Sequence, residues 1–433
     1  MTQQDTFFIL APVTEDRAED LLSLLASMTL EPGLADPQNE LVPFGRFDQL
    51  HVARFFLVKA NTWQDIEAYG NDPEPYPLHL AFLGDVDGDR QSFLKELVAR
   101  CGDELTSIFS HCDGGAEGGD LLRWMEAHNV EEAANYVNTR GRTVRQIHEE
   151  AALASALQTE LANVVKAHGS ADPFKIHERL VEFVDRQRAE GSLHLTAPER
   201  PGLLQRLANW FDLISVPLVL LLISPLVLLA LPFFLLRLRL LERTDPEILP
   251  RPGDAHIAEL GRYEDHDVTN PFSAFGDVKP GLFRRFVTTV ALYLLNYSAR
   301  HIYGRGYLTR VQTIHFARWV FVDGKRRVMF CSNYDGALES YMDDFVNKVA
   351  WGLNLVFSNG VGYPSTRFLI KGGAEQEAKF KRYLRNRQLP TQVWYKAYPG
   401  LTARDLARHS EIRKGLESRP GGAKALRNWL SKI

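Results

Sequence analysis

The stretches LHVARFFLV (Leu50–Val58) and IHFARWVFV (Ile314–Val322) share one pattern, in which His-x-Ala-Arg is followed by an apolar run. Apolar and β-branched runs of this length predict buried β-strands. Two further pairs recur in the same order: FLGDVDG (82–88) with FCSNYDG (330–336), and YVNTRGRTVRQI (136–147) with YKAYPGLTARDL (395–406). Three matches in one order, each at the same kind of structural junction, indicate an internal duplication.

The two copies predict similar secondary structure. In the first copy we expect strands over 7–13, 50–58, 78–83 and 134–137, and helices over 15–28 and 90–109. In the second copy we expect strands over 311–322, 327–332 and 392–397, a hairpin at Asp323-Gly324, and helices over 338–357 and 402–416, the last one capped by Thr402. Hairpins split by helices that pack on one face predict an α+β fold of two ferredoxin-like repeats. Pairing of the two sheets would give a pseudo-dimeric α/β barrel without exposed sheet edges.

An uncharged segment, ISVPLVLLLISPLVLLALPFFLL (214–236), separates the two copies and favours insertion into a bilayer. Pro217, Pro225 and Pro232 each remove a backbone donor, so we expect two short helical legs that meet at Ser224-Pro225. These legs would form a membrane-embedded helical hairpin that dips into one leaflet. Its two ends would then lie on the same side of the membrane, as the pairing of the two copies also requires.

The flanks of this segment support the same topology. Trp210 stands where an interfacial aromatic residue is expected, and Arg237 and Arg239 follow the apolar run. Basic residues on both sides favour a cytoplasmic location for both ends, so the globular part should face the cytoplasm and membrane lipid should be a partner. We therefore divide the chain into a first repeat (1–150), a helical linker (151–209), a membrane hairpin (210–240), a connector with an interfacial helix (241–305) and a second repeat (306–433).

Composition excludes several classes of function. The net charge is −4, and the three cysteines lack the spacing of a zinc site or a disulfide framework. The N-terminal MTQQDTFFILAPV has no basic region followed by an apolar core, so we expect no signal peptide. Fingerprints for nucleotide binding or for hydrolytic catalysis are absent, and nucleic acid is not an expected partner.

The candidate chemical residues lie in the matched stretches. If His51 and His315 face the barrel interior, a neutral imidazole could bind haem iron or shuttle protons. The alternative is a buried histidine that is hydrogen-bonded to a carboxylate. Arg54 and Arg318 could act beside them or form buried ion pairs with Asp87 and Asp335, where Asp335 also suits a helix cap. Tyr395 could line an apolar ligand pocket or simply pack in the core.

This arrangement resembles the dimeric α/β-barrel superfamily, whose duplicated members include dye-decolourising peroxidases and relatives of chlorite dismutase. The stretches IHFARWVFVDG, SNYDG, YMDDFVNKV and VWYKAYPG are also similar to an uncharacterised bacterial membrane-associated family. The first resemblance implies haem as cofactor. His315, His301 and His409 are then the candidate proximal ligands, and Asp87 is the acid of the GxxDG motif at 84–88. In the second copy Ser332 replaces the first glycine of that motif.

Two functions are consistent with these observations. One is a peroxidase-like oxidoreductase that acts on a lipophilic substrate from the bilayer. The other is a non-catalytic lipid-binding or scaffold protein at the cytoplasmic face of the membrane.

Overall fold

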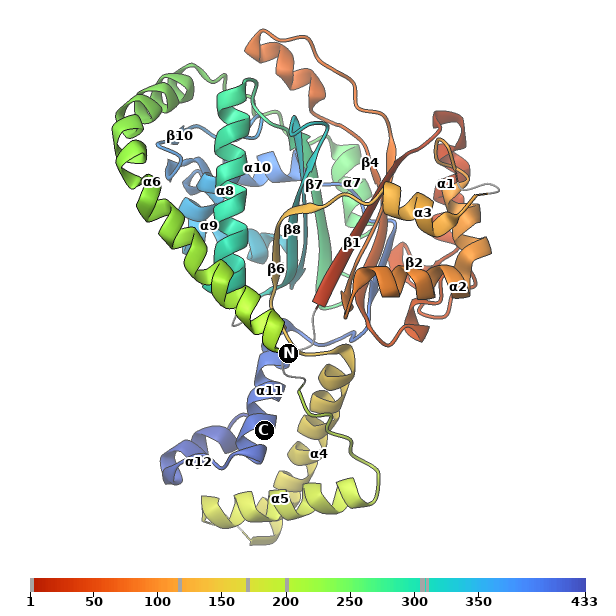
Figure 1. Ribbon diagram of the computed structural model, residues 1–433. Helices are drawn as coiled ribbons and strands as arrows, with labels where there is room; N and C mark the ends of the chain where they lie inside the picture. The colour runs from red at the N-terminus through yellow and green to blue at the C-terminus, as the bar shows by residue number, and fades with distance from the viewer. Residues whose placement is uncertain (1–3, 116–118, 169–171, 199–201, 304–307, 309–310) are drawn as a thin grey trace.

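Two β-sheets pack face to face in the centre of the molecule, and helices cover their outer faces (Figure 1). The computed structural model describes residues 4–115, 119–168, 172–198, 202–303, 308 and 311–433. The layer order of helix, sheet, sheet and helix confirms the expected mixed α+β class.

The first sheet consists mainly of strands from the N-terminal half. Its spatial order is β1 (Gln4–Pro12), β5 (His79–Asp87), β4 (Leu50–Val58), β12 (Val393–Lys396), β3 (Gly33–Ala35) and β2 (Thr29–Glu31). The helices on its outer face are α1 (Ala18–Ala26), α2 (Arg90–Phe109) and α3 (Leu121–Ala127). The strand β12 comes from the C-terminal half, so the two halves of the chain are interleaved.

The second sheet likewise contains one strand from the other half of the chain. Its order is β6 (Glu132–Val137), β8 (Ile314–Val322), β9 (Arg327–Asp335) and β7 (Thr269–Asp277). Here β6 is the strand that comes from the N-terminal half. The outer face is covered by α8 (Leu282–His301), α9 (Leu338–Phe357) and α10 (Glu377–Arg387). The strand β7 falls within the region predicted to be a connector (241–305), and the interfacial helix predicted in that connector corresponds to α8.

The predicted closed barrel is wrong, because the strands belong to two separate sheets. The chain touches β1 just before β6, where Leu10 N donates to His128 O (3.0 Å) and Val130 N donates to Phe8 O (2.8 Å). It touches β7 just before β12, where Leu389 N donates to Ser273 O (2.8 Å). After each of these contacts the chain crosses to the opposite sheet. Neither contact therefore extends into a ladder of backbone hydrogen bonds that would close the barrel. The space between the sheets is filled by apolar side chains, including Phe8, Phe56, Val58, Leu83, Phe275, Val320 and Met329.

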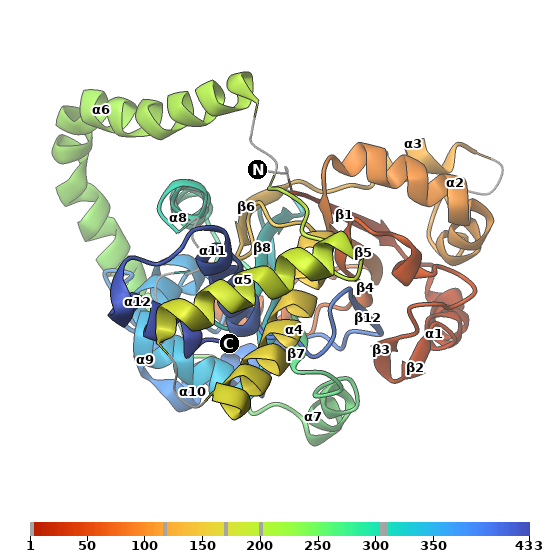
Figure 2. The ribbon, with the colours of Figure 1, turned by 90° about the horizontal axis from the view of Figure 1, so that it is seen from below.

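Most of the segment predicted as a linker is part of a separate helical group, which lies below the sheets in Figure 1 and in front of them in Figure 2. The helices α4 (Val144–His168) and α5 (Pro173–Ala189) pack with α11 (Ala403–Glu417) and α12 (Gly422–Leu430). Leu157, Leu180, Ile412 and Trp429 are buried in their shared core. The remaining short elements are α7 (Asp254–Gly261), η1 (Glu15–Arg17), η2 (Phe44–Arg46), η3 (Trp63–Tyr69), η4 (Gly373–Glu375), β10 (Thr366–Arg367) and β11 (Lys371–Gly372).

The predicted membrane hairpin is also wrong, because the apolar segment lies within one helix, α6 (Leu203–Thr244). Pro217, Pro225 and Pro232 are inside this helix. Each proline removes one backbone hydrogen bond and crowds the preceding turn, which bends a helix without ending it. Figures 1 and 2 show the resulting strong bend.

Candidate functional site

The two candidate histidines lie at irregularities of their strands. The register between β4 and β5 shifts between Leu50 and Val52, and the register between β8 and β9 shifts between Ile314 and Phe316. His51 and His315 are therefore the extra residues of two β-bulges. Regular alternation would place His51 on the outer face of the first sheet, beside the buried Phe55. A bulge re-aims side chains, and the His51 ring lies 5.5 Å from that of Phe316 of the opposite sheet.

Each histidine is bonded to an aspartate that also holds the start of a helix. His51 Nε2 lies 2.9 Å from Asp87 Oδ1, and Val144 N, the first residue of α4, donates to Asp87 Oδ2 at 2.8 Å. His315 Nε2 lies 2.6 Å from Asp335 Oδ1. Ala403 N, the first residue of α11, donates to Asp335 Oδ2 at 2.7 Å. Carboxylates are favourable at helix N-termini, so both matched stretches carry the same strand-to-helix clamp.

Tyr398 lies between the two clamps. Its hydroxyl is 3.3 Å from His51 Nδ1, and its ring centroid is 6.4 Å from that of His315. Burial raises the pKa of Tyr398, so the phenol stays protonated at neutral pH. Burial also lowers the pKa of His315, although Asp335 opposes this effect. Burial therefore favours the neutral form of the His315 imidazole, whose Nε2 is within hydrogen-bond distance of Asp335.

The second clamp contains two residues that the sequence did not indicate. Thr269 Oγ1 donates to Asp335 Oδ1 at 2.7 Å, and Lys396 Nζ donates to Thr269 Oγ1 at 2.6 Å. Burial lowers the pKa of Lys396 to about 8, against the carboxylates of Asp267 and Asp335. Thr269 was missed because it starts β7, a strand that lay inside the predicted connector. Lys396 lies in the matched stretch YKAYPG, but the first copy has Val137 at that position.

The arginines of the His-x-Ala-Arg pattern cross between the sheets and do not pair with Asp87 or Asp335. Arg54 donates to Ser273 Oγ (3.1 Å) and to Ser332 O (3.0 Å), and it also contacts Asn333 of the second sheet. Burial lowers its pKa to about 10. The predicted pairs are wrong because strand alternation directs the arginines into the intersheet layer, whereas Asp87 and Asp335 stand at the strand ends.

Arg318 makes the reciprocal crossing into the first sheet. It donates to Phe7 O at 3.1 Å and forms a buried ion pair with Asp85. Burial raises the pKa of Asp85, although Arg318 opposes this effect. A buried carboxylate with this tendency depends on its partner to stay charged.

We call the two histidine–aspartate pairs, together with Tyr398, Thr269 and Lys396, the polar cluster. Tyr395 is not part of it. Its ring stacks on Phe44 with centroids 5.3 Å apart, in the core beneath α1 and α2. Burial raises its pKa to about 12. The residue thus has a packing role in the first sheet.

The residues of the polar cluster do not fit a haem group. Haem binding requires a ring nitrogen that faces a large cavity. His51 and His315 are 0% and 1% exposed, and the Nε2 atom of each is bonded to an aspartate. His315 Nδ1 has no hydrogen-bond partner among the described residues, but the ring packs beside Tyr398. The intersheet layer next to both rings is filled by protein side chains.

A second candidate surface is formed by α6 and α8. Among the described residues, α6 is the one helix that is long and apolar enough to cross a membrane. Its N-terminal part contacts the end of α8, where Tyr297 Oη donates to Leu213 O at 2.7 Å and His301 Nε2 lies 2.9 Å from Asp212. Near its C-terminal end the Phe234 ring lies 5.1 Å from that of Phe283, at the start of α8. Both ends of the apolar segment are thus attached to one helix of the globular domain.

The middle of α6 is exposed. Exposed apolar residues between the two attachments include Leu218, Leu221, Leu222, Leu226, Leu228, Leu229 and Phe233. The neighbouring side of α8 adds Leu282, Phe286, Val290 and Tyr293. We call these residues the apolar face. Exposed large apolar residues in such numbers on two helices that contact each other mark a binding surface for protein or lipid.

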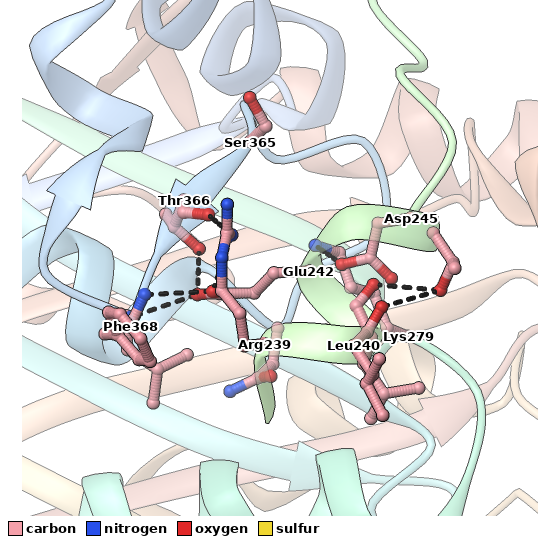
Figure 3. A network of polar contacts seen from close by, with 12 residues as sticks. Arg239, Leu240, Glu242, Asp245, Lys279, Ser365, Thr366 and Phe368 are labelled. Atoms are coloured by element: carbon pink, nitrogen blue, oxygen red, sulfur yellow. Dashed lines mark hydrogen bonds and ion pairs between the residues drawn. The ribbon is translucent and has the colours of Figure 1, made fainter. Parts of the chain in front are cut away.

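A polar network fixes the C-terminal end of α6 (Figure 3). The buried Glu242 accepts hydrogen bonds from Thr366 Oγ1 (3.0 Å), Phe368 N (2.9 Å) and Leu369 N (2.9 Å). Phe368 and Leu369 have φ angles of 56° and 59°, in the left-handed region. These backbone conformations are unfavourable for non-glycine residues. The hydrogen bonds that Glu242 accepts stabilise the loop in this strained conformation.

The predicted membrane residues occupy three settings. Trp210 and Arg237 are exposed on α6, the three prolines lie inside the helix, and Arg239 belongs to the polar network, with its guanidinium 3.2 Å from Glu242. An apolar cavity of about 150 Å³ lies close by, between α8, α9 and the outer face of the second sheet.

Comparison with known proteins gave no match to a family model, to a curated protein or to a solved structure.

Proposed function

We propose that this protein is a monotopic membrane protein that lies on one face of a bilayer through α6 and α8 and acts there as a non-catalytic binding or scaffold protein. The observation that carries the proposal is the attachment of both ends of the apolar segment to α8. A helix that crossed the bilayer would carry its two ends to opposite sides. Here both ends remain against the globular domain, so α6 enters one leaflet and does not cross.

The composition of the apolar face favours lipid over a second copy of the chain. The segment 214–236 consists mostly of Leu, Ile, Val and Phe, each of which favours the bilayer by roughly 0.3–0.6 kcal/mol on insertion scales. Arg206, Arg237 and Arg243 are exposed at its two ends, and no described residue forms an ion pair with them. Basic residues beside an apolar surface are attracted to anionic headgroups. They also support a cytoplasmic location for the globular part.

The polar cluster supports a structural role. Each histidine–aspartate pair joins a bulge, a strand end and a helix N-terminus, and among the described residues apolar side chains fill the intersheet layer beside both rings. We therefore favour binding over the peroxidase-like activity expected from the resemblance. The two matched clamps and the reciprocal arginines support our proposal that the chain arose by duplication of one ferredoxin-like unit.

Vesicle flotation tests this proposal. The wild-type protein should float with vesicles of phosphatidylcholine and phosphatidylglycerol. The variant Leu222→Glu/Leu226→Glu/Leu229→Glu should remain in the aqueous fraction. Leu30→Glu is the matched control, because Leu30 is similarly exposed but lies on β2. Flotation of the triple variant would contradict the proposal, as would a wild-type protein that stays in water as a dimer through this face.

Labelling tests the one-sided topology. Variants that each carry one introduced cysteine, at Leu203, Arg243 or Leu226, are added to preformed vesicles and treated with a membrane-impermeant maleimide. The cysteines at 203 and 243 should both react, whereas the cysteine at 226 should be protected. The native Cys101, Cys112 and Cys331 are buried and give little background. Protection of just one of the two end positions would indicate a crossing helix.

A further inference from the structure

The apolar cavity has walls from three elements. Ala291 and Leu295 line it from α8, Met342 and Phe345 from α9, and Trp319 and Phe330 from the second sheet. Its lining is mostly apolar, and its polar groups are the hydroxyls of Ser298 and Tyr303 and the indoles of Trp319 and Trp351. A cavity lined by such side chains stays dry and binds apolar molecules in place of water.

The mouth of the cavity opens beside the apolar face. Leu294 and Trp351 line the cavity and are 36% and 51% exposed. Leu355 also lines it and packs in the cluster that contains Leu238 of α6. Figures 1 and 2 both show α8 and α9 on the concave side of the bent helix α6. An apolar path therefore leads from the exposed surface of α6 and α8 to the cavity.

We infer that this cavity binds the terminal hydrocarbon segment of a lipid acyl chain that enters from the bilayer between α8 and α9. The inference rests on the proposed membrane attachment. Continuity with the apolar face identifies the occupant, because a chain in the adjoining leaflet reaches the mouth without crossing water. The volume limits its size, since a cavity of about 150 Å³ accommodates roughly six carbon atoms, the size of benzene.

Gly352 offers a way to fill the cavity without harm to the fold. It lies in α9, lines the cavity, and a Cβ atom added there would meet no atom within 4 Å. Leucine at this position should extend into the cavity. It also has a higher helix propensity than glycine. Gly102→Leu is the matched control, because Gly102 is a helical glycine of α2 whose added Cβ would lie 3.8 Å from Val98.

Photocrosslinking with the full chain tests the inference. The probe is a phosphatidylcholine with a diazirine at the end of one acyl chain, incorporated into vesicles that also contain phosphatidylglycerol. Peptide mass spectrometry of the wild-type protein and of Gly102→Leu should locate adducts on α6 and on the buried Met342 and Phe345. The Gly352→Leu variant should lose the adducts at Met342 and Phe345 and keep those on α6.

The outcomes separate the two proposals. Adducts confined to α6 in the wild-type protein would overturn the acyl-chain site and leave the membrane attachment standing. Adducts at Met342 and Phe345 that persist in Gly352→Leu would also overturn it, because the probe would then reach these residues by another route. Absence of adducts on α6 would overturn the membrane attachment itself.

Discussion

Arg54 and Arg318 lie at matching positions of β4 and β8, and each side chain ends among the polar groups of the sheet opposite to its own. The two crossings join the sheets through an otherwise apolar layer. They differ in one respect: Arg318 pairs with the buried carboxylate of Asp85, whereas Arg54 is held by neutral groups.

This difference predicts unequal effects of substitution. Arg318→Met leaves Asp85 buried without its partner, so we expect a loss of about 3–5 kcal/mol in the free energy of unfolding. Arg54→Met leaves only neutral acceptors unpaired and should cost about 1–3 kcal/mol. Denaturant unfolding in mild detergent measures both values.

A double substitution isolates the charge. Arg318→Met/Asp85→Asn should be more stable than Arg318→Met alone, since the unpaired carboxylate is gone. Arg326→Met, which removes an arginine of an exposed ion pair, should change little. Equal losses for Arg54→Met and Arg318→Met would show that Asp85 is not the source of the difference.

The network at the end of α6 predicts a local effect. Glu242→Gln keeps the shape of the side chain but replaces one acceptor oxygen with a donor, which faces the donors Thr366, Phe368 and Leu369. The loss should be about 1–3 kcal/mol, and the strained loop should open first. Hydrogen exchange should therefore accelerate at the amides of Phe368 and Leu369. Glu247→Gln, at an exposed ion pair with Lys379, should leave these amides unchanged.

The pKa of His315 predicts a pH dependence of stability. Burial lowers this pKa below its usual value of 6.5, so the folded state binds a proton less readily than the unfolded state. The contribution of the neutral His315 to the free energy of unfolding is complete above pH 6.5, and it is lost as the pH falls from there through the lower pKa of the folded state. We expect the unfolding free energy of the wild-type protein to decrease from pH 7 to pH 5.

His315→Gln should decrease less over the same interval. The residual slope reflects other histidines whose pKa values burial also lowers, such as His79 and His409. Parallel curves for the wild-type protein and His315→Gln would show that His315 takes up its proton equally in both states.

Local sequence patterns predicted most strands and helices but not how they combine. Alternation located β4 and β8, yet it could not reveal the bulges at His51 and His315, because a bulge inserts one residue without changing the residue types around it. The strand β7 was missed since TNPFSAFGD contains a proline and a glycine. Proline is tolerated there because β7 is an edge strand.

The exchange of β6 and β12 between the sheets depends on contacts far apart in the chain. No local pattern distinguishes a strand that returns to its own sheet from one that crosses to the other. The membrane segment shows the opposite limitation: its apolar character was evident, but three prolines suit both a broken hairpin and a bent helix. The continuity of α6 through Ser224-Pro225, which a single sequence does not reveal, distinguishes the two.

The prolines of α6 provide the last prediction. A straight helix between residues 207 and 240 would span about 50 Å at 1.5 Å per residue. Because α6 is bent, spin labels at Leu207→Cys and Leu240→Cys should give a shorter distance in the wild-type background. Pro217→Ala/Pro225→Ala/Pro232→Ala restores the missing backbone donors and should lengthen this distance towards the straight value, with loss of the contact at one end of α8. Pro252→Ala, outside the helix, should leave the distance unchanged. If the triple variant kept the short distance, the contacts with α8, and not the prolines, would determine the bend.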